Sequence, residues 1–171
     1  MPREKMQQMM QDLKKNNKEL QEMMDRNLSL LEQLKVEKDF NELIDKMNEL
    51  SEKLENTNES NNDSLSAQDA KSQFDKLSQE LDSIIQKNNG LQEPFNISKD
   101  EQMESEINSD LDEAGEMEKS GDDKGSIQKK NEAGKKMKEM AENMSMNMMM
   151  SGMEQLAEDA HLVRILLENV V

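Results

Sequence analysis

The sequence predicts an all-α protein, an elongated antiparallel bundle or coiled coil of about four helices. Apolar residues recur at spacings of three and four in four separate segments, which is the period of an amphipathic helix. Helix-favouring residues are abundant, and 17 of them are Met. The chain has three Phe, no Trp, no Tyr and two Pro, so a β-sandwich or an α/β enzyme would lack its usual core residues.

The composition limits the size of any core. The 171 residues carry a formal net charge of −16, and Leu, Ile, Val and Phe together number 32. Chains of this kind lie near the boundary of intrinsic disorder, so we expect long helices that share a thin apolar stripe. A surface this acidic repels nucleic acid and anionic lipid, so neither is an expected partner.

The first helix is predicted at about residues 3–56. Two Asn, Asn16 and Asn27, interrupt its apolar stripe, and the spacing slips by one residue between Leu34 and Phe40. A helix of about 54 residues is about 80 Å long. Polar residues in such a stripe usually set the register of a coiled coil or bundle. The stripe consists of Met6, Met9, Leu13, Leu20, Met23, Leu30, Leu34, Phe40, Leu43, Met47, Leu50 and Leu54.

Two shorter helices are predicted at about 66–88 and 98–120, after loops at 57–65 and 89–97. Ser66 with Asp69, and Ser98 with Glu101, have capping-box spacing. Residues 88–90 (NNG) form a stop signal, because Asn and Gly tolerate the left-handed conformation that ends many helices. Pro94 interrupts the chain between the two helices.

A turn at 121–125 is predicted to lead into a fourth helix at 126–171. Residues 99–123 hold eleven acids and two Lys, whereas residues 126–138 hold five Lys and one Glu. Lysines near a helix N-terminus interact unfavourably with the helix dipole, so these lysines need acidic partners outside their own helix. We therefore expect the acidic residues 110–118 to lie beside the basic start of the fourth helix, which holds Lys129, Lys130, Lys135, Lys136 and Lys138. There the charges guide helix pairing more than they stabilise it.

The segment lengths suggest how the helices are arranged. Residues 3–56, 66–120 and 126–171 have similar lengths, which predicts three long antiparallel segments, the middle one broken near Pro94. The whole chain, 1–171, is then a single elongated helical region. The alternative is a flexible chain of helical hairpins.

The sequence lacks the residues that several kinds of catalytic or metal site require. The chain has no Cys, so thiolate catalysis, disulfides and Cys-based metal sites are excluded. No signal-peptide core or membrane span is evident, so the chain is expected to be soluble as given. Glu158 and His161 have the Glu-x-x-His spacing of di-iron bundles, but His161 is the only His and such a site needs two copies. Asp110 and Asp112 resemble the start of a calcium loop, but Gly121 occupies the position of its closing Glu. We expect no enzyme, cofactor or catalytic site.

The Met-rich segment 144–153 allows two interpretations. Met144, Met146, Met148 and Met149 could supply thioether ligands to Cu(I). Met also fills helix interfaces and grooves that bind apolar helices, and this packing role is the favoured one. The end of the fourth helix carries more apolar residues than one face can hold, which predicts an interface with a protein partner or a second copy. Its contact residues are Leu162, Ile165, Leu166 and Val170.

Three stretches carry a family resemblance: residues 25–40 (DRNLSLLEQLKVEKDF), 129–144 (KKNEAGKKMKEMAENM) and 158–171 (EDAHLVRILLENVV). They resemble the C-terminal coiled-coil region of a bacterial family of large membrane-anchored proteins, rich in Gln, Glu, Lys and Met, whose function is unassigned. The resemblance implies that this chain is part of a longer, envelope-associated protein that continues past Val171.

The expected function follows from shape and from these exclusions. We expect a non-enzymatic structural or protein-interaction module, a scaffold or docking segment of a larger envelope-associated protein. The alternative is a Met-rich protein that binds Cu(I) or an apolar helix.

Overall fold

The computed structural model describes residues 3–57 and 65–170; for residues 3–4, 158–159 and 162–170 it describes the backbone alone. Four helices follow one another: α1 (Arg3–Glu55), α2 (Ala67–Asn88), α3 (Glu101–Ser120) and α4 (Asp123–Val170). No strand lies among the described residues. The predicted all-α class and the four predicted helices are confirmed.

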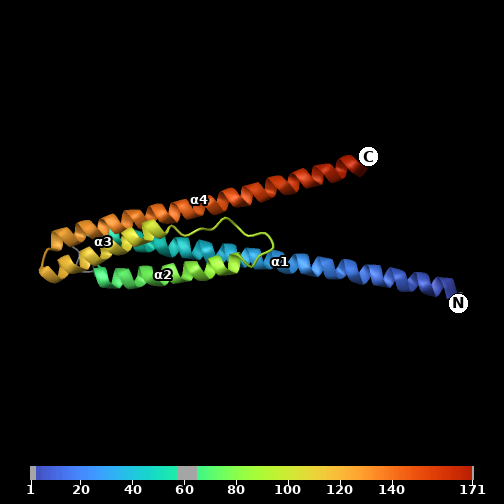
Figure 1. Cartoon of the computed structure of the whole chain (residues 1–171), viewed down its shortest axis with the longest axis horizontal. Coiled ribbons are helices and arrows are strands. Elements are labelled where there is room, and N and C mark those ends of the chain that lie inside the picture. Colours follow the sequence, from blue (N-terminus) through green and yellow to red (C-terminus); the bar gives the residue numbers. More distant parts are fainter. Residues whose placement is uncertain (1–2, 58–64, 171) are drawn as a thin grey trace.

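The helices form an antiparallel bundle in which each packs against the next and α4 packs back against α1 (Figure 1). Lys46 of α1 forms an ion pair with Glu80 of α2 at 2.7 Å, and Asp39 pairs with Lys87 at 2.9 Å. Residue numbers therefore increase in opposite directions along α1 and α2, so these two helices are antiparallel. Figure 1 shows α1 and α3 running in one direction and α2 and α4 in the other.

The prediction of three long segments is wrong for the middle one. Residues 66–120 do not form one interrupted segment, because the linker 89–100 reverses the chain and makes α2 and α3 antiparallel neighbours (Figure 1). The first residue of α2, Ala67, donates its N–H to Glu118 near the end of α3. At the other end of the pair, Lys99 contacts Asp82 at 3.1 Å. Reversal lets α2 and α3 each bury an apolar stripe in the same core.

The core is built from one stripe of each helix and from the linker. Phe40 and Phe74 are its largest side chains and are fully buried. Ile97 of the linker also lies in the core, and Phe95 packs against it. The remaining large apolar members are Val36, Leu43, Ile44, Met47, Leu50, Leu54, Leu77, Leu81, Ile84, Ile107, Leu111, Met137, Met140, Met144 and Met148.

The helix ends confirm one capping prediction and correct others. Ser66 caps α2 as predicted, since its hydroxyl accepts from the N–H of Asp69. For α3 the cap is Asp100, not Ser98, because the Asp100 carboxylate accepts from the N–H of Met103. The predicted five-residue turn before α4 is shorter: Gly121 ends α3 at φ 80°, and α4 begins at Asp123. A glycine fits that left-handed position without steric cost.

Helix α2 ends where the sequence predicts, but for a different reason. Asn89 has an ordinary right-handed conformation, and among the described residues Gly121 is the only one with a positive φ. Instead, the buried Asn88 side chain forms hydrogen bonds with the backbone of Phe95 in the linker. The chain therefore turns because a side chain holds the returning segment.

The bundle covers only part of the two longest helices. On α1 the core begins at Val36, and on α4 it ends at Met148. The stripe predicted along all of 3–56 is therefore buried only in its second half. Helices α2 and α3, of 22 and 20 residues, are too short to cover the 53 residues of α1. We call residues 3–35 the first arm and residues 149–170 the second arm; both leave the same end of the bundle (Figure 1).

Candidate functional site

Both arms expose large apolar side chains. In the first arm these side chains are 50% to 64% exposed, and in the second arm the described ones are 55% to 70% exposed. Exposed apolar stripes of this length are typical of interaction surfaces. The exposed residues are Met6, Met9, Met10, Leu13, Leu20, Met23, Met24, Leu28, Leu30, Leu31 and Leu34 in the first arm, and Met149, Met150, Met153 and Leu156 in the second.

The first arm has a strict seven-residue repeat. Paired residues recur at 9–10 (MM), 16–17 (NN), 23–24 (MM) and 30–31 (LL), and a further residue precedes each pair by three positions. These residues occupy heptad positions d, e and a, so they form one stripe that is wider than the a/d stripe of a simple coiled coil. Met10, Met24 and Leu31 at position e are absent from the predicted stripe. The doublets seven residues apart are the signal that identifies them.

The predicted charge pairing between α3 and α4 is confirmed. Asp110, which is 5% exposed, accepts hydrogen bonds from Lys129 at 3.2 Å and from Lys136 at 2.7 Å. Hydrogen bonds to Glu113 and Asp110 raise the pKa of Lys129 above its usual range. The hydrogen bond to Asp110 is likewise the main cause that raises the pKa of Lys136. These contacts fix how α3 and α4 pair. They also engage the Asp110 carboxylate, which the candidate calcium loop would need as a ligand.

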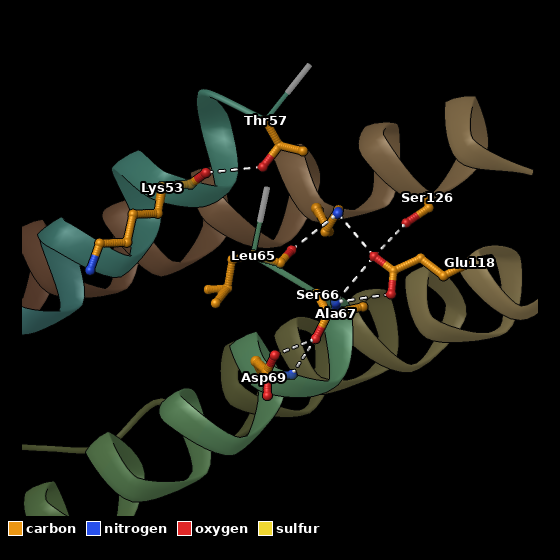
Figure 2. Close-up of polar contacts among 9 residues, drawn as sticks. Lys53, Thr57, Leu65, Ser66, Ala67, Asp69, Glu118 and Ser126 are labelled. Atoms are coloured by element: carbon orange, nitrogen blue, oxygen red, sulfur yellow. Dashed lines mark hydrogen bonds and ion pairs between the residues drawn. The ribbon is translucent and has the colours of Figure 1, made fainter. Parts of the chain in front are cut away.

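A second polar cluster joins three helices around Glu118 (Figure 2). Its carboxylate accepts from Lys130 at 2.9 Å, from the Ala67 N–H at 3.2 Å and from the Ser126 hydroxyl at 3.3 Å. Lys130 is only 3% exposed and also donates to the carbonyl of Leu65 at 3.2 Å. A buried ammonium needs such partners, because burying a charge alone is costly. The cluster closes the end of the bundle opposite the arms.

The candidate metal ligands are not assembled. His161 is exposed, and the side chain of Glu158 lies outside the described part. Within the described residues, no group of three or more His, Cys, Asp or Glu side chains could hold a metal ion.

The four candidate Cu(I) ligands lie on different sides of α4. Met144 and Met148 are buried in the core, whereas Met146 and Met149 are 59% and 67% exposed. Met144 and Met146 border a groove beside the start of α3, lined also by Lys99 and Asp100. The structure therefore shows a packing role for Met144 and Met148 and does not bring the four thioethers together.

The predicted contact residues at the end of α4 cannot be placed. The side chains of Leu162, Ile165, Leu166 and Val170 lie outside the described part, although the backbone of α4 continues through Val170. The interface predicted there remains a prediction.

No protein-family model, no curated protein and no solved structure matches the chain. In the part of the chain that the structure describes, no helix carries an apolar stretch long enough to cross a membrane.

Proposed function

We propose that the chain is a non-enzymatic structural module that binds other protein helices through its two arms. One observation carries this proposal: α1 is a continuous helix whose apolar stripe is covered from Val36 onward and exposed before it. The same kind of stripe is present on both sides of that boundary. The first arm therefore has the apolar residues of a helix interface, and its contact with the rest of the chain is at its end, where Gln33 donates to the Glu93 carbonyl of the linker at 3.1 Å.

The energetics favour a partner. Full burial of a Leu or Met side chain contributes about 1.5–3 kcal/mol relative to exposure. The first arm exposes eleven such side chains, so even partial burial against a partner helix can offset the cost of association. Soluble monomers rarely keep an apolar surface of this length open to water.

The bundle acts as the base that positions the arms. The Glu118 cluster and the pairs of Asp110 with Lys129 and Lys136 hold α3 and α4 in one alignment. Because α1 and α4 are both bundle helices, their arms leave the base as direct continuations of it. A rigid base with two projecting helices suits a spacer or docking segment. The resemblance in residues 25–40, 129–144 and 158–171 supports a place for this module within a larger, envelope-associated protein.

Crosslinking in native cells, followed by peptide mapping, tests the proposal. We expect protein crosslinks to concentrate on first-arm lysines such as Lys14, Lys15 and Lys18, and to be depleted at the exposed Lys76 of α2. A Leu13→Asp/Leu20→Asp variant should lose them, because it places charges in the exposed stripe. Gln79→Asp, on the exposed surface of α2, is the control. Arms that crosslink to no protein, including a second copy, would contradict the proposal.

A further inference from the structure

Two Asn residues interrupt the apolar stripe of the first arm, and their positions limit the registers in which another helix can pair with it. Asn16 occupies heptad position d and Asn27 occupies position a, and both are exposed. A buried Asn in a helix interface is tolerated when it meets another polar group, and it disfavours registers in which it meets an apolar one. The arm's partner must therefore offer polar groups opposite these two positions.

A second, antiparallel copy of the arm places polar groups opposite Asn16 and Asn27 in one register. In an antiparallel pair, position a of one helix faces position d of the other, so the possible registers differ by seven residues. In one of them Asn16 faces Asn27 of the second copy, and Leu20 faces Met23. In the same register Leu13 faces Leu30 and Met9 faces Leu34, so at positions a and d polar residues meet polar ones and apolar residues meet apolar ones. The other antiparallel registers place Asn16 or Asn27 against Leu or Met.

The flanking charges agree with this register. Glu19 and Arg26 both occupy position g and are exposed. Flanking contacts in an antiparallel pair join g to g, and here they bring Glu19 beside Arg26 of the second copy, twice by symmetry. In a parallel pair position g faces position e, which would place these charges beside Met24 and Leu31. Charge complementarity therefore favours the antiparallel orientation.

The break in the stripe of α1 separates the part that packs in the bundle core from the part that is free to pair with a second copy. The spacing slips by one residue between Leu34 and Phe40, and the bundle core begins at Val36. Leu34 is the last residue of the paired stripe in this register. An intermolecular interface would thus start where the intramolecular core stops. It would also place the two bundles at opposite ends of the paired arms, where they do not collide.

From these observations we infer that the first arm binds the first arm of a second copy of this chain. The pair is antiparallel, with Leu20 facing Met23 across a twofold axis. This inference rests on the proposed function and names the partner of that surface. The paired region, residues 9–34, is about 39 Å long.

Cysteine crosslinking tests the register directly, because the chain has no native Cys. Leu13→Cys and Leu30→Cys are made as separate variants of the full chain and oxidised alone or as an equal mixture. The mixture should give a disulfide-linked dimer, since the two positions face each other. Each variant alone should give at least about tenfold less, because identical positions are 17 residues, or about 25 Å, apart along the axis, beyond the reach of a disulfide. Efficient crosslinking of either variant alone would show a parallel pair and overturn the inference.

Charge reversal provides a second test that leaves the apolar stripe intact. Glu19→Arg and Arg26→Glu should each weaken dimerisation several-fold in sedimentation equilibrium, because each creates two like-charge contacts. An equal mixture should restore the affinity, since the two variants then complement each other. Helicity measured by circular dichroism should not change. Monomeric protein at high micromolar concentration would overturn the inference, whereas arm crosslinks to other proteins would still support the proposed function.

Discussion

The side chain of Asn88 forms two hydrogen bonds with the backbone of Phe95, seven residues later. Its Nδ2 donates to the Phe95 carbonyl at 2.8 Å, and its Oδ1 accepts from the Phe95 N–H at 2.8 Å. Asn88 is buried, so these bonds are shielded from competing water. They hold the linker against the end of α2 and place Phe95 and Ile97 against the core.

Asn88→Ala should destabilise the bundle by about 1–3 kcal/mol, because it leaves the partly buried Phe95 N–H without its acceptor. It also removes one of the two donors to the Phe95 carbonyl, which keeps only the Ile97 N–H. Urea denaturation followed by circular dichroism measures the change. Asn89→Ala is the matched control, since Asn89 is the exposed neighbour and should have little effect. Equal stability of the two variants would show that the linker is held by apolar packing alone.

Two glycines of α4 should respond in opposite ways to Ala. At Gly134 an added Cβ would lie 3.0 Å from both the Leu54 Cβ and the Ser51 carbonyl oxygen of α1, whereas nothing lies within 4 Å at Gly152. Gly134→Ala should therefore separate α1 from α4 and lower stability. Gly152→Ala should stabilise the helix by up to about 1 kcal/mol, because Ala is the better helix former. Thermal melts distinguish them, and a stabilising Gly134→Ala would show that the two helices can separate at little cost.

Removal of the Glu118 carboxylate should cost more than removal of an exposed acid from the same helix. Glu118→Ala leaves the buried Lys130 without its ion pair and Ala67 without its N–H acceptor, so we expect a loss of about 1–3 kcal/mol. Glu116→Ala, on the exposed side of α3, should change the free energy of unfolding by less than about 0.5 kcal/mol. Similar values in urea denaturation would mean that the cluster adds no net stability.

The protein should lose stability in alkaline solution. The hydrogen bond to Asp110 raises the pKa of Lys136 above its ordinary value of 10.5, and the bond to Glu80 raises that of Lys46. A group whose pKa is higher in the folded state contributes stability that is complete below the ordinary pKa and is lost as the pH rises through the folded-state value. The melting temperature should therefore fall as the pH rises above the ordinary lysine pKa of 10.5.

Paired variants identify the lysines responsible. In Lys129→Gln/Lys136→Gln the alkaline fall should be smaller, because the ion pairs with Asp110 are already absent. Lys135→Gln/Lys138→Gln changes two exposed lysines of the same helix and should leave the fall unchanged. An identical pH profile in both variants would assign the effect to lysines elsewhere in the chain.

Local patterns in the chain were enough to predict the helices. The 3,4 spacing, the Ser66 cap and the break near Pro94 act within a few residues of each other, so they predict where helices begin and end. The acidic and basic halves flanking Gly121 also predicted the contact between α3 and α4, because a short turn leaves two helices little choice but to pair. The sequence also predicted the apolar stripe of the first arm. It did not predict the position-e residues that widen this stripe, or that the stripe is exposed.

The reversal at the linker and the exposure of the arms depend on contacts between distant residues. Ala67 and Glu118 are 51 residues apart, and no local spacing indicates that α2 and α3 lie side by side. Only that reversal halves the length of the bundle and leaves residues 3–35 beyond the reach of α2 and α3. A 3,4 stripe has the same appearance whether it is buried or exposed, because the period reports only that one helix face is apolar and not what covers it.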